Sequence, residues 1–378
     1  MSDLSPSLRY HSVQPQSIKT GYNEFDNIDM LIAVGPNRSL VMNSVRICGD
    51  LLVETAAGTR AASQAGVQFD ERVGAHAFIE SLQITSQNQG NLENIGNSYA
   101  RYVAMAGVAS LSDNDYNNAT HICELKGANA EVAQRYCEGI TATATTATPI
   151  AYDADFSIKP MCALNKMNAN LAFNKTGTIT LTCNLARNMS ALYGFGQNAA
   201  TKYTLKNLRC TFNSMPDSKT PQTVSMRTIH SVKSNILSGS ATISANVNAV
   251  CDAVSISVLK QANENVPQQN NYALENMINF NQVQYLFNDQ TNSLITYRIS
   301  DQTEVLQRYV DSMYNSGHNQ VALSKFRGNG GWGMGLEFDG NIDLSSNTFT
   351  IQLESGVGSG AANTPYAIWM YFHSSVQV

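Results

Sequence analysis

Alternation of apolar and polar residues is the main pattern of this chain, and it predicts short β-strands. Residues 77–85 and 177–185 alternate over their whole length, so each strand would have one apolar face. Similar runs recur from residue 30 to the C-terminal end, separated by stretches rich in Gly, Asn, Asp and Pro. The further strands predicted are 38–47, 51–55, 155–160, 203–212, 224–229, 240–247, 253–259, 282–287 and 293–299. Gly49 and Asp50 would separate the first two of these.

The last fifty residues carry the densest pattern. Residues 332–354 hold two alternating runs, and a Gly/Ser/Asn loop then leads to the aromatic segment Tyr366–His373. This segment predicts a buried strand of a β-sandwich, which completes a core as the chain ends. A fold of this kind more often presents a surface than a catalytic pocket.

Two stretches have helical spacing instead. Between residues 91 and 105, apolar residues recur mostly three or four positions apart. A second helix would begin at Asp301, because Glu304 three positions later completes a capping box. We therefore predict one short helix inserted in each half of the chain.

These elements divide the chain into three parts. Residues 1–29 are polar, are broken by two prolines and predict an N-terminal arm that is disordered or ordered against neighbours. Residues 30–216 and 217–378 would be two domains, because the stretch 215–221 is polar and holds two prolines. About eight strands in each domain predict an all-β fold of two tandem eight-stranded jelly rolls, a double jelly roll.

Composition adds a hint about the surface. Charged residues make up 14% of the chain, against about 25% in typical soluble proteins. Asn, Gln, Ser and Thr take their place, which suits strands and turns and also suits a surface covered by copies of the same chain. An ordinary polar β-protein would have the same composition.

Charge and hydropathy exclude several classes of protein. The formal net charge is −5 and no run of Lys and Arg occurs, so direct nucleic-acid binding is not expected. No apolar run approaches the roughly 20 residues of a membrane span. The first residues do not resemble a signal peptide, so we expect a protein made and used on the cytosolic side.

The cysteines point to packing and not to chemistry. Their number is odd and none forms a CxxC motif, so a zinc site or a disulfide framework is not expected. We predict that they are small buried hydrophobic residues. They are Cys48, Cys123, Cys137, Cys162, Cys183, Cys210 and Cys251.

Candidate catalytic and metal-binding residues are few. His76 is the first histidine to test for catalysis, although a half-buried histidine at a strand end is far commoner. Asp339 and Asp343 bracket a predicted turn similar to a Ca²⁺ loop, but no bidentate Glu follows at the required place. The glycine-rich run 328–335 precedes a strand, whereas a phosphate loop must follow one.

An aromatic set at the C-terminal end offers one more alternative. Trp332, Tyr366, Trp369 and Tyr371 could form a sugar-binding platform, but core aromatics are the favoured interpretation. The sequence thus predicts no catalytic, cofactor-binding or metal-binding residue, and it predicts no enzyme.

The order of the elements resembles the double jelly-roll major capsid proteins of tailless icosahedral DNA viruses, a lineage that includes adenovirus hexons, membrane-containing phages and virophages. The resemblance covers roughly residues 30–378. The stretches that carry it are 78–84, 92–99, 156–160, 203–208, 215–217, 284–289, 304–312, 336–345 and 365–372.

The resemblance implies a structural role. The chain would form homotrimers that are pseudo-hexagonal and tile an icosahedral shell, with residues 1–29 along the inner face. Residues 112–148 and 260–272 would be tower or inter-subunit loops. Penton and minor capsid proteins would be further partners, and the resemblance admits an internal membrane beneath the shell. The protein would be synthesised in host cytoplasm and located in the virion.

Two other functions stay open at this point. One is a two-domain β-sandwich that binds carbohydrate or acts in adhesion, which would need an exposed aromatic cluster. The other is a jelly-roll hydrolase, which would need a His and carboxylate set that the sequence does not show.

Overall fold

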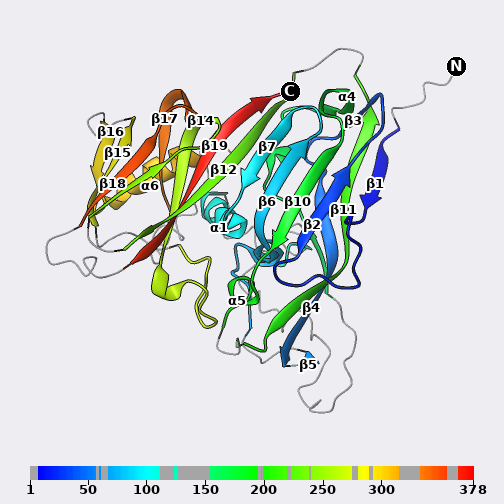
Figure 1. Cartoon of the computed structure of the whole chain (residues 1–378), viewed down its shortest axis with the longest axis horizontal. Coiled ribbons are helices and arrows are strands. Elements are labelled where there is room, and N and C mark those ends of the chain that lie inside the picture. The colour runs from blue at the N-terminus through cyan, green and yellow to red at the C-terminus, as the bar shows by residue number, and fades with distance from the viewer. Residues whose placement is uncertain are drawn as a thin grey trace.

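The computed structural model describes residues 7–56, 59–60, 67–110, 123–126, 154–194, 197, 199–218, 223–237, 240–274, 280–288, 293–314, 333–355 and 365–378. Strands dominate this part of the chain, and they form two β-sandwiches that lie side by side (Figure 1). The predicted surface excursion 112–148 lies outside the described residues, apart from residues 123–126.

The first sandwich packs two sheets face to face. One contains β2 (Asn27–Ile32), β6 (Ile79–Ser86), β7 (Gly90–Ile95) and β10 (Ile179–Leu185). The other is built around two long strands, β4 (Arg46–Ala56) and β11 (Lys202–Pro216). The shorter strands of that second sheet are β1 (Arg9–Val13), β3 (Arg38–Leu40), β5 (Thr59–Arg60), β8 (Ala154–Ile158) and β9 (Leu171–Ala172).

The second sandwich has four strands in each sheet. The strands of the inner sheet are β12 (Ser225–Ile236), β14 (Val250–Lys260), β17 (Met334–Asp343) and β19 (Tyr366–Gln377). Those of the outer sheet are β13 (Ala241–Ala245), β15 (Phe280–Phe287), β16 (Ser293–Arg298) and β18 (Phe349–Ser355). Two antiparallel sheets of four strands each are the layout of a jelly roll. The predicted double jelly roll is therefore confirmed.

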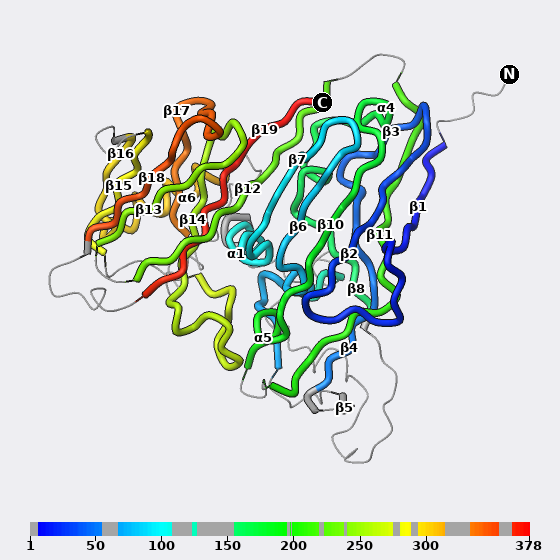
Figure 2. The backbone as a smooth tube through the Cα atoms, in the orientation of Figure 1, coloured from blue at the N-terminus to red at the C-terminus, as the bar shows by residue number. Residues whose placement is uncertain are grey.

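The two sandwiches share one sheet. β7 of the first jelly roll and β12 of the second run parallel and meet at a single bridge, between Asn94 and His230 (Figure 2). The inner sheets thereby join in the order β17-β14-β19-β12-β7-β6-β10-β2. A second isolated bridge joins Met167 of the first jelly roll to Met226 of β12. Backbone contacts at the joint are therefore short and isolated among the described residues, and side chains supply further contacts.

The C-terminal strand β19 is buried on both faces. All residues from Tyr366 to Ser374 are buried. Phe372 packs edge-on against Phe349 of the outer sheet, with ring centroids 5.6 Å apart, and Tyr366 lies 5.9 Å from Phe280 in the same core. The predicted buried closing strand is confirmed, and its lack of alternation follows because both faces are covered.

One of the two predicted helices begins later than expected. Helix α1 spans Tyr99–Ser110, whereas residues 90–95 form strand β7, so the prediction of a helix over 91–105 was wrong in its first half. Leu92 and Ile95 are buried in a strand, and their spacing of three fits either structure. Helix α6 (Gln302–Tyr314) begins as predicted, with Asp301 Oδ1 accepting from the Glu304 amide at 3.2 Å.

Short helical turns connect the strands. They are η1 (Gly74–Phe78), η3 (Ala163–Asn165), α4 (Phe173–Thr176), α5 (Asn188–Ala191) and η4 (Gln261–Asn263). No helix in the described ranges is long and apolar enough to cross a membrane.

The predicted break at Gly49 and Asp50 was wrong, because β4 runs through both residues. A Cβ on Gly49 would lie 2.9 Å from a Leu208 methyl and 3.1 Å from the Phe156 ring. The glycine therefore marks a close approach between neighbouring strands and not a turn.

A second predicted turn was also wrong. Residues 339–343 belong to β17, which is bulged opposite Cys251 and Ala253, with Gly340 at a φ of +115°. The turn begins only after Asp343. Glycine suits the bulge because L side chains rarely adopt this backbone conformation.

The N-terminal residues lie on the first jelly roll. β1 pairs with β11 along residues 9–13, and β2 pairs with β10 along residues 27–32. The predicted arm boundary at residue 29 falls inside β2. Tyr22, which lies between β1 and β2, is buried and exchanges backbone hydrogen bonds with Leu205.

Five of the cysteines, including Cys162 and Cys210, are buried free thiols, as predicted. Cys123 is exposed, and Cys137 lies outside the described residues. Burial raises the pKa of the Cys183 thiol to about 12. These buried thiols are therefore inert packing groups.

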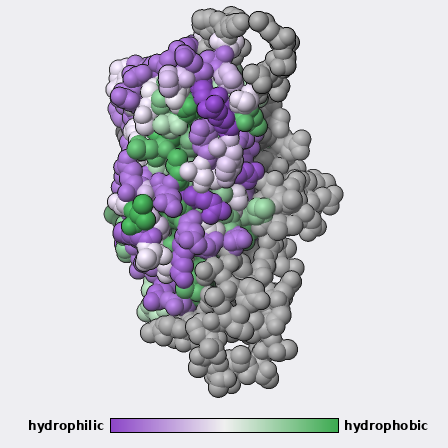
Figure 3. All heavy atoms as spheres, turned by 90° about the vertical axis from the view of Figure 1, so that its right-hand side faces the viewer, coloured by the Kyte–Doolittle hydropathy of each residue, from purple (hydrophilic) through white to green (hydrophobic). Residues whose placement is uncertain are grey.

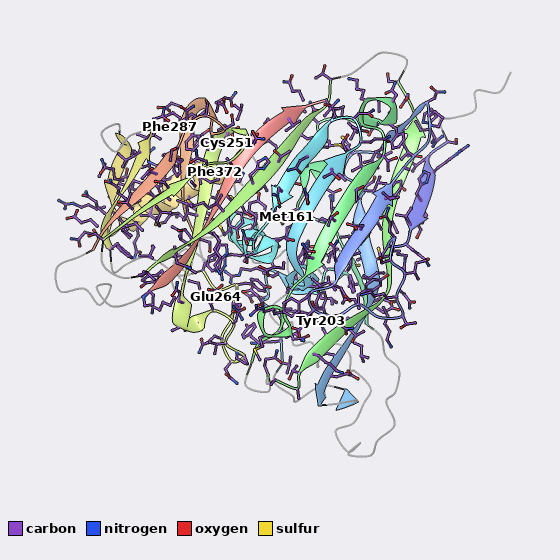
Figure 4. All side chains as sticks on the ribbon, in the orientation of Figure 1. Met161, Tyr203, Cys251, Glu264, Phe287 and Phe372 are labelled. Carbon is purple, nitrogen blue, oxygen red and sulfur yellow. The ribbon has the colours of Figure 1, made fainter. Side chains whose placement is uncertain are left out.

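We expect truncation of the closing strand to be costly. Phe372→Ala should lower the free energy of unfolding by about 3–5 kcal/mol, because it opens a cavity in the core against Phe349. Chemical denaturation of the purified protein measures this loss. Phe287→Ala is the matched control, since Phe287 is only half-buried. Figure 4 labels both residues. An equal loss in both variants would contradict this account of β19.

Candidate functional site

Helix α1 of the first jelly roll packs against the second one. The Tyr371 hydroxyl of β19 donates to the Ser98 carbonyl at 2.8 Å, just before the helix begins. In the middle of α1, the Tyr309 hydroxyl of α6 donates to the Met105 carbonyl at 2.6 Å. The ring of Tyr102 lies 5.4 Å from that of Tyr371. Helix α1 therefore covers the face of β19 that points away from the core of the second jelly roll.

Glu93 of β7 ties three elements together at this joint. Its carboxylate accepts from the Ala163 amide of η3 at 2.7 Å and from the Ile229 amide of β12 at 3.0 Å. The side chain is fully buried, and burial raises its pKa to about 7, although the two amides and Lys166 favour the charged form. Glu93 thus bonds both jelly rolls beside the bridge between β7 and β12.

The segment 261–274 of the second jelly roll lies on the first one. The Asn270 side chain donates to Asp70 Oδ2 at 2.7 Å, and the Tyr272 hydroxyl donates to the Ala77 carbonyl at 3.1 Å. Asn271 Nδ2 donates to the Met189 carbonyl at 2.8 Å. Several polar groups of this segment are therefore used within the chain, and its role as a tower or inter-subunit loop stays a prediction.

Asp70 is a buried anchor for that segment. Arg72 forms an ion pair with it, at 2.6 Å between Nη2 and Oδ2. Burial alone would raise the pKa of Asp70, but the charge and hydrogen bonds of Arg72, with help from Asn270, lower it below its usual value. The carboxylate therefore stays charged and holds Asn270 in place.

His76 belongs to a second buried polar cluster. It lies fully buried in η1, so the expected half-buried position at a strand end was wrong. Its Nδ1 is 2.9 Å from the Tyr99 hydroxyl, and its Nε2 is 3.4 Å from Glu124 Oε2. The Tyr99 oxygen also accepts from the Met161 amide at 2.8 Å.

Lys126 completes this cluster, 2.9 Å from Glu124 Oε2. Burial would raise the pKa of Glu124, but His76 and Lys126 hold it well below its usual range. Their groups join η1, α1 and residues 124–126 in a buried setting. A catalytic histidine must reach its substrate, so His76 has a structural role here.

The other candidates also have structural positions. Tyr366, Trp369 and Tyr371 are at most 3% exposed, so the preference for core aromatics over a sugar platform is confirmed, while Trp332 lies outside the described residues. Asp343 accepts from the amide and the hydroxyl of Ser345, which lowers its pKa and shapes the turn after β17. Across the described ranges, no three His, Cys, Asp or Glu side chains could hold a metal ion together.

Comparison of the whole chain with solved structures gives a consistent result. The Faustovirus major capsid protein matches with a TM-score of 0.60 at 9% identity, over 99% of this chain and 90% of that one. PBCV-1 VP54, fitted into a reconstruction of the virophage Sputnik, matches with a TM-score of 0.58 at 10% identity, over 99% and 95%. The mavirus major capsid protein matches with a TM-score of 0.50 at 11% identity, over 98% and 90%.

This chain has the double jelly-roll fold of major capsid proteins. No protein-family model and no curated protein matches it by sequence. The likeness therefore lies in the arrangement of both jelly rolls over almost the full length, at an identity that carries no residue roles across.

The joint of this double jelly roll was not foreseen from the sequence. Glu93 and Arg101, whose guanidinium lies 4.0 Å from the Trp369 ring centroid, are both buried. The available signal was a charged residue between apolar neighbours in a chain with few charges. Sequence spacing gave no means of pairing residues 93 and 101 with partners more than 130 positions away.

The raised pKa of Glu93 predicts a pH-dependent stability. The folded-state pKa of Glu93 lies above the ordinary value of 4.5. The contribution of this residue to the free energy of unfolding is therefore fully present below pH 4.5 and is lost as pH rises through about 7. The difference in unfolding free energy between wild type and Glu93→Gln should fall by about 3 kcal/mol across this window. Denaturant titrations from pH 4.5 to pH 8 measure it.

Exposed Glu354 provides the control for this measurement. Glu354→Gln makes the same chemical change on a side chain that is not buried, so it reports what the substitution does without burial. A flat difference for Glu93→Gln from pH 4.5 to pH 8 would show that Glu93 does not titrate in this range.

Proposed function

We propose that this chain is a viral major capsid protein that forms homotrimers, which tile an icosahedral shell. The observation that carries the proposal is the match of both jelly rolls, over nearly the whole of each chain, to the Faustovirus and PBCV-1 capsid proteins. These neighbours are shell components, which favours a structural role over an enzymatic one.

The joint supports this role through geometry. Six similar β-sandwiches are needed around a pseudo-hexagonal tile, and three copies of a double jelly roll provide them. The tile keeps its shape only if both jelly rolls of a chain hold a constant angle, and α1, Glu93 and the segment 261–274 all bridge them. Closed three-fold symmetry would make the tile, and further contacts would make the lattice.

The face that carries β1 has properties of a contact surface (Figure 3). Among the described residues, β1 pairs only with β11, so its other edge is open. Leu8, Tyr10 and Ile18 on this N-terminal stretch are 61%, 68% and 73% exposed. An open strand edge with exposed apolar side chains is prone to pair with another chain, which a shell protein can use.

The proposal includes the further partners implied by the resemblance. Penton and minor capsid proteins would contact the trimers, and an internal membrane beneath the shell is compatible with the fold. The protein would act in the virion after synthesis in host cytoplasm. No basic surface run supports direct nucleic-acid contact.

The mass in solution tests the trimer. Size exclusion with light scattering should give a species near three times 41.1 kDa, because obligate interfaces of ~2,000 Å² or more do not open on dilution. A change of salt should convert trimers to larger particles. A monomer that never associates would overturn the proposal and favour the carbohydrate-binding or adhesion protein.

A short N-terminal deletion tests the arm. Removing all of residues 1–29 would take away β1 and part of β2, so it would damage the first jelly roll itself. Removing residues 1–8 leaves both strands intact. We expect trimers of normal stability and fewer shells by electron microscopy, since an arm along the inner face links neighbouring trimers.

Thermal denaturation of the same deletion variant is the control for folding. Shells in normal yield would contradict the role of residues 1–8 in assembly. Loss of the trimer would show that these residues act inside the capsomer and not between capsomers.

A further inference from the structure

A pocket opens at the joint, where the two jelly rolls and the segment 261–274 meet. Its volume is about 330 Å³, which lies at the lower end of the range for small-molecule sites. Phe25 and Arg187 line it from the first jelly roll, and Lys233 and Glu264 from the second. Glu264 lies between the two jelly rolls in Figure 4.

Arg101 lines the pocket as a buried cation without an ion pair. Its guanidinium lies 4.0 Å from the Trp369 ring centroid and is 2% exposed. It donates only to neutral oxygens, which belong to Ser257 at 3.3 Å, Ala273 at 3.1 Å and Asn271. Its Nε has no hydrogen-bond partner, and no carboxylate of the described residues is within ion-pair distance.

Such an arginine is unusual. Buried charges in proteins are almost always paired, because an unpaired charge loses its hydration without compensation. Burial indeed lowers the pKa of Arg101. The positive potential of the guanidinium therefore extends into the pocket, where it would attract an anion.

The other charges of the pocket do not cancel this potential. Lys233 and Glu264 form an ion pair with each other. Glu80, which accepts from the Ser98 amide at 3.2 Å, is a second carboxylate, and burial raises its pKa. The cations of the lining still outnumber its carboxylates, with three arginine or lysine side chains against two glutamates. Arg187 is exposed at the mouth and adds a second positive charge.

Phe25 supplies an apolar wall in an unusual conformation. Its side chain is 64% exposed, and its φ of +67° is one that bulky residues rarely adopt. The Arg187 guanidinium lies 5.5 Å from the centroid of its ring. Strained backbone conformations cluster at functional sites, and this one holds an aromatic ring at the mouth of the pocket.

We propose that this pocket binds a small organic anion, namely a carboxylate attached to an aromatic or short aliphatic group. The carboxylate would lie in the field of Arg101 and Arg187, and the apolar group would pack against Phe25. The ligand could be a free acid or the C-terminal residue of a protein segment, since both present the same chemistry. The site belongs to the single chain and does not rest on the proposed capsid function.

Calorimetry with the full-length protein tests the ligand chemistry. Phenylacetate should bind with a Kd on the order of 1 mM or below. Phenylacetamide has the same shape without the charge and should bind at least about tenfold more weakly. No binding of any acid, or equal binding of acid and amide, would overturn the proposal.

A peptide ligand distinguishes the two sources of the carboxylate. The tripeptide Ala-Ala-Phe with a free C-terminus presents the same carboxylate and ring at the end of a chain. If it binds more tightly than phenylacetate, the site is one for a protein C-terminus. If phenylacetate binds as tightly or more tightly, the site is one for a free acid.

Variants at the mouth test the assigned residues without disturbing the buried floor. Arg187→Gln should weaken phenylacetate binding by about tenfold, and Phe25→Ala should weaken it by about fivefold. Arg209→Gln is the matched control, because Arg209 is exposed on β11 outside the pocket. Equal affinity for wild type and Arg187→Gln would overturn the assignment.

Discussion

Burial of β19 on both faces is the constraint on which the rest of this structure depends. One face completes the core of the second jelly roll through Phe372, and the other receives α1 through Tyr371. A strand with two apolar faces cannot meet water on either side without a large cost in hydrophobic free energy. The second jelly roll is therefore complete only when the first one lies against it, so the two form one cooperative unit.

The charged residues of this chain are few, and they are not confined to its surface. Several are buried at or near the joint, among them Glu93, Arg101 and Glu124, where desolvation opposes them. When every partner is in place, buried polar groups add little to the free energy of unfolding. They select one arrangement of the joint, because a shifted joint would leave them without partners. The buried polar groups therefore favour one fixed arrangement of the two jelly rolls.

The sequence predicts the strands well because side-chain alternation is a local property. Residues 177–185 alternate, and β10 occupies 179–185. Prediction fails at segments whose secondary structure depends on partners that are distant in the chain. Strand β7 is an example, because the spacing of three between Leu92 and Ile95 fits a helix and a strand equally. The polar segment 260–272 resembles an exposed loop for the same reason, since only the fold shows that its amides bind the first jelly roll.

The isolated bridges between the two sandwiches, Asn94 to His230 and Met167 to Met226, have a mechanical consequence. A long ladder of backbone hydrogen bonds loaded along its strands must break many bonds at once, whereas isolated bridges break one at a time. Tension that separates the two sandwiches would therefore be borne by the hydroxyl and carboxylate contacts of Tyr371, Tyr309 and Glu93. A stretched chain would therefore yield first along this seam and not within the strand ladders of either sandwich.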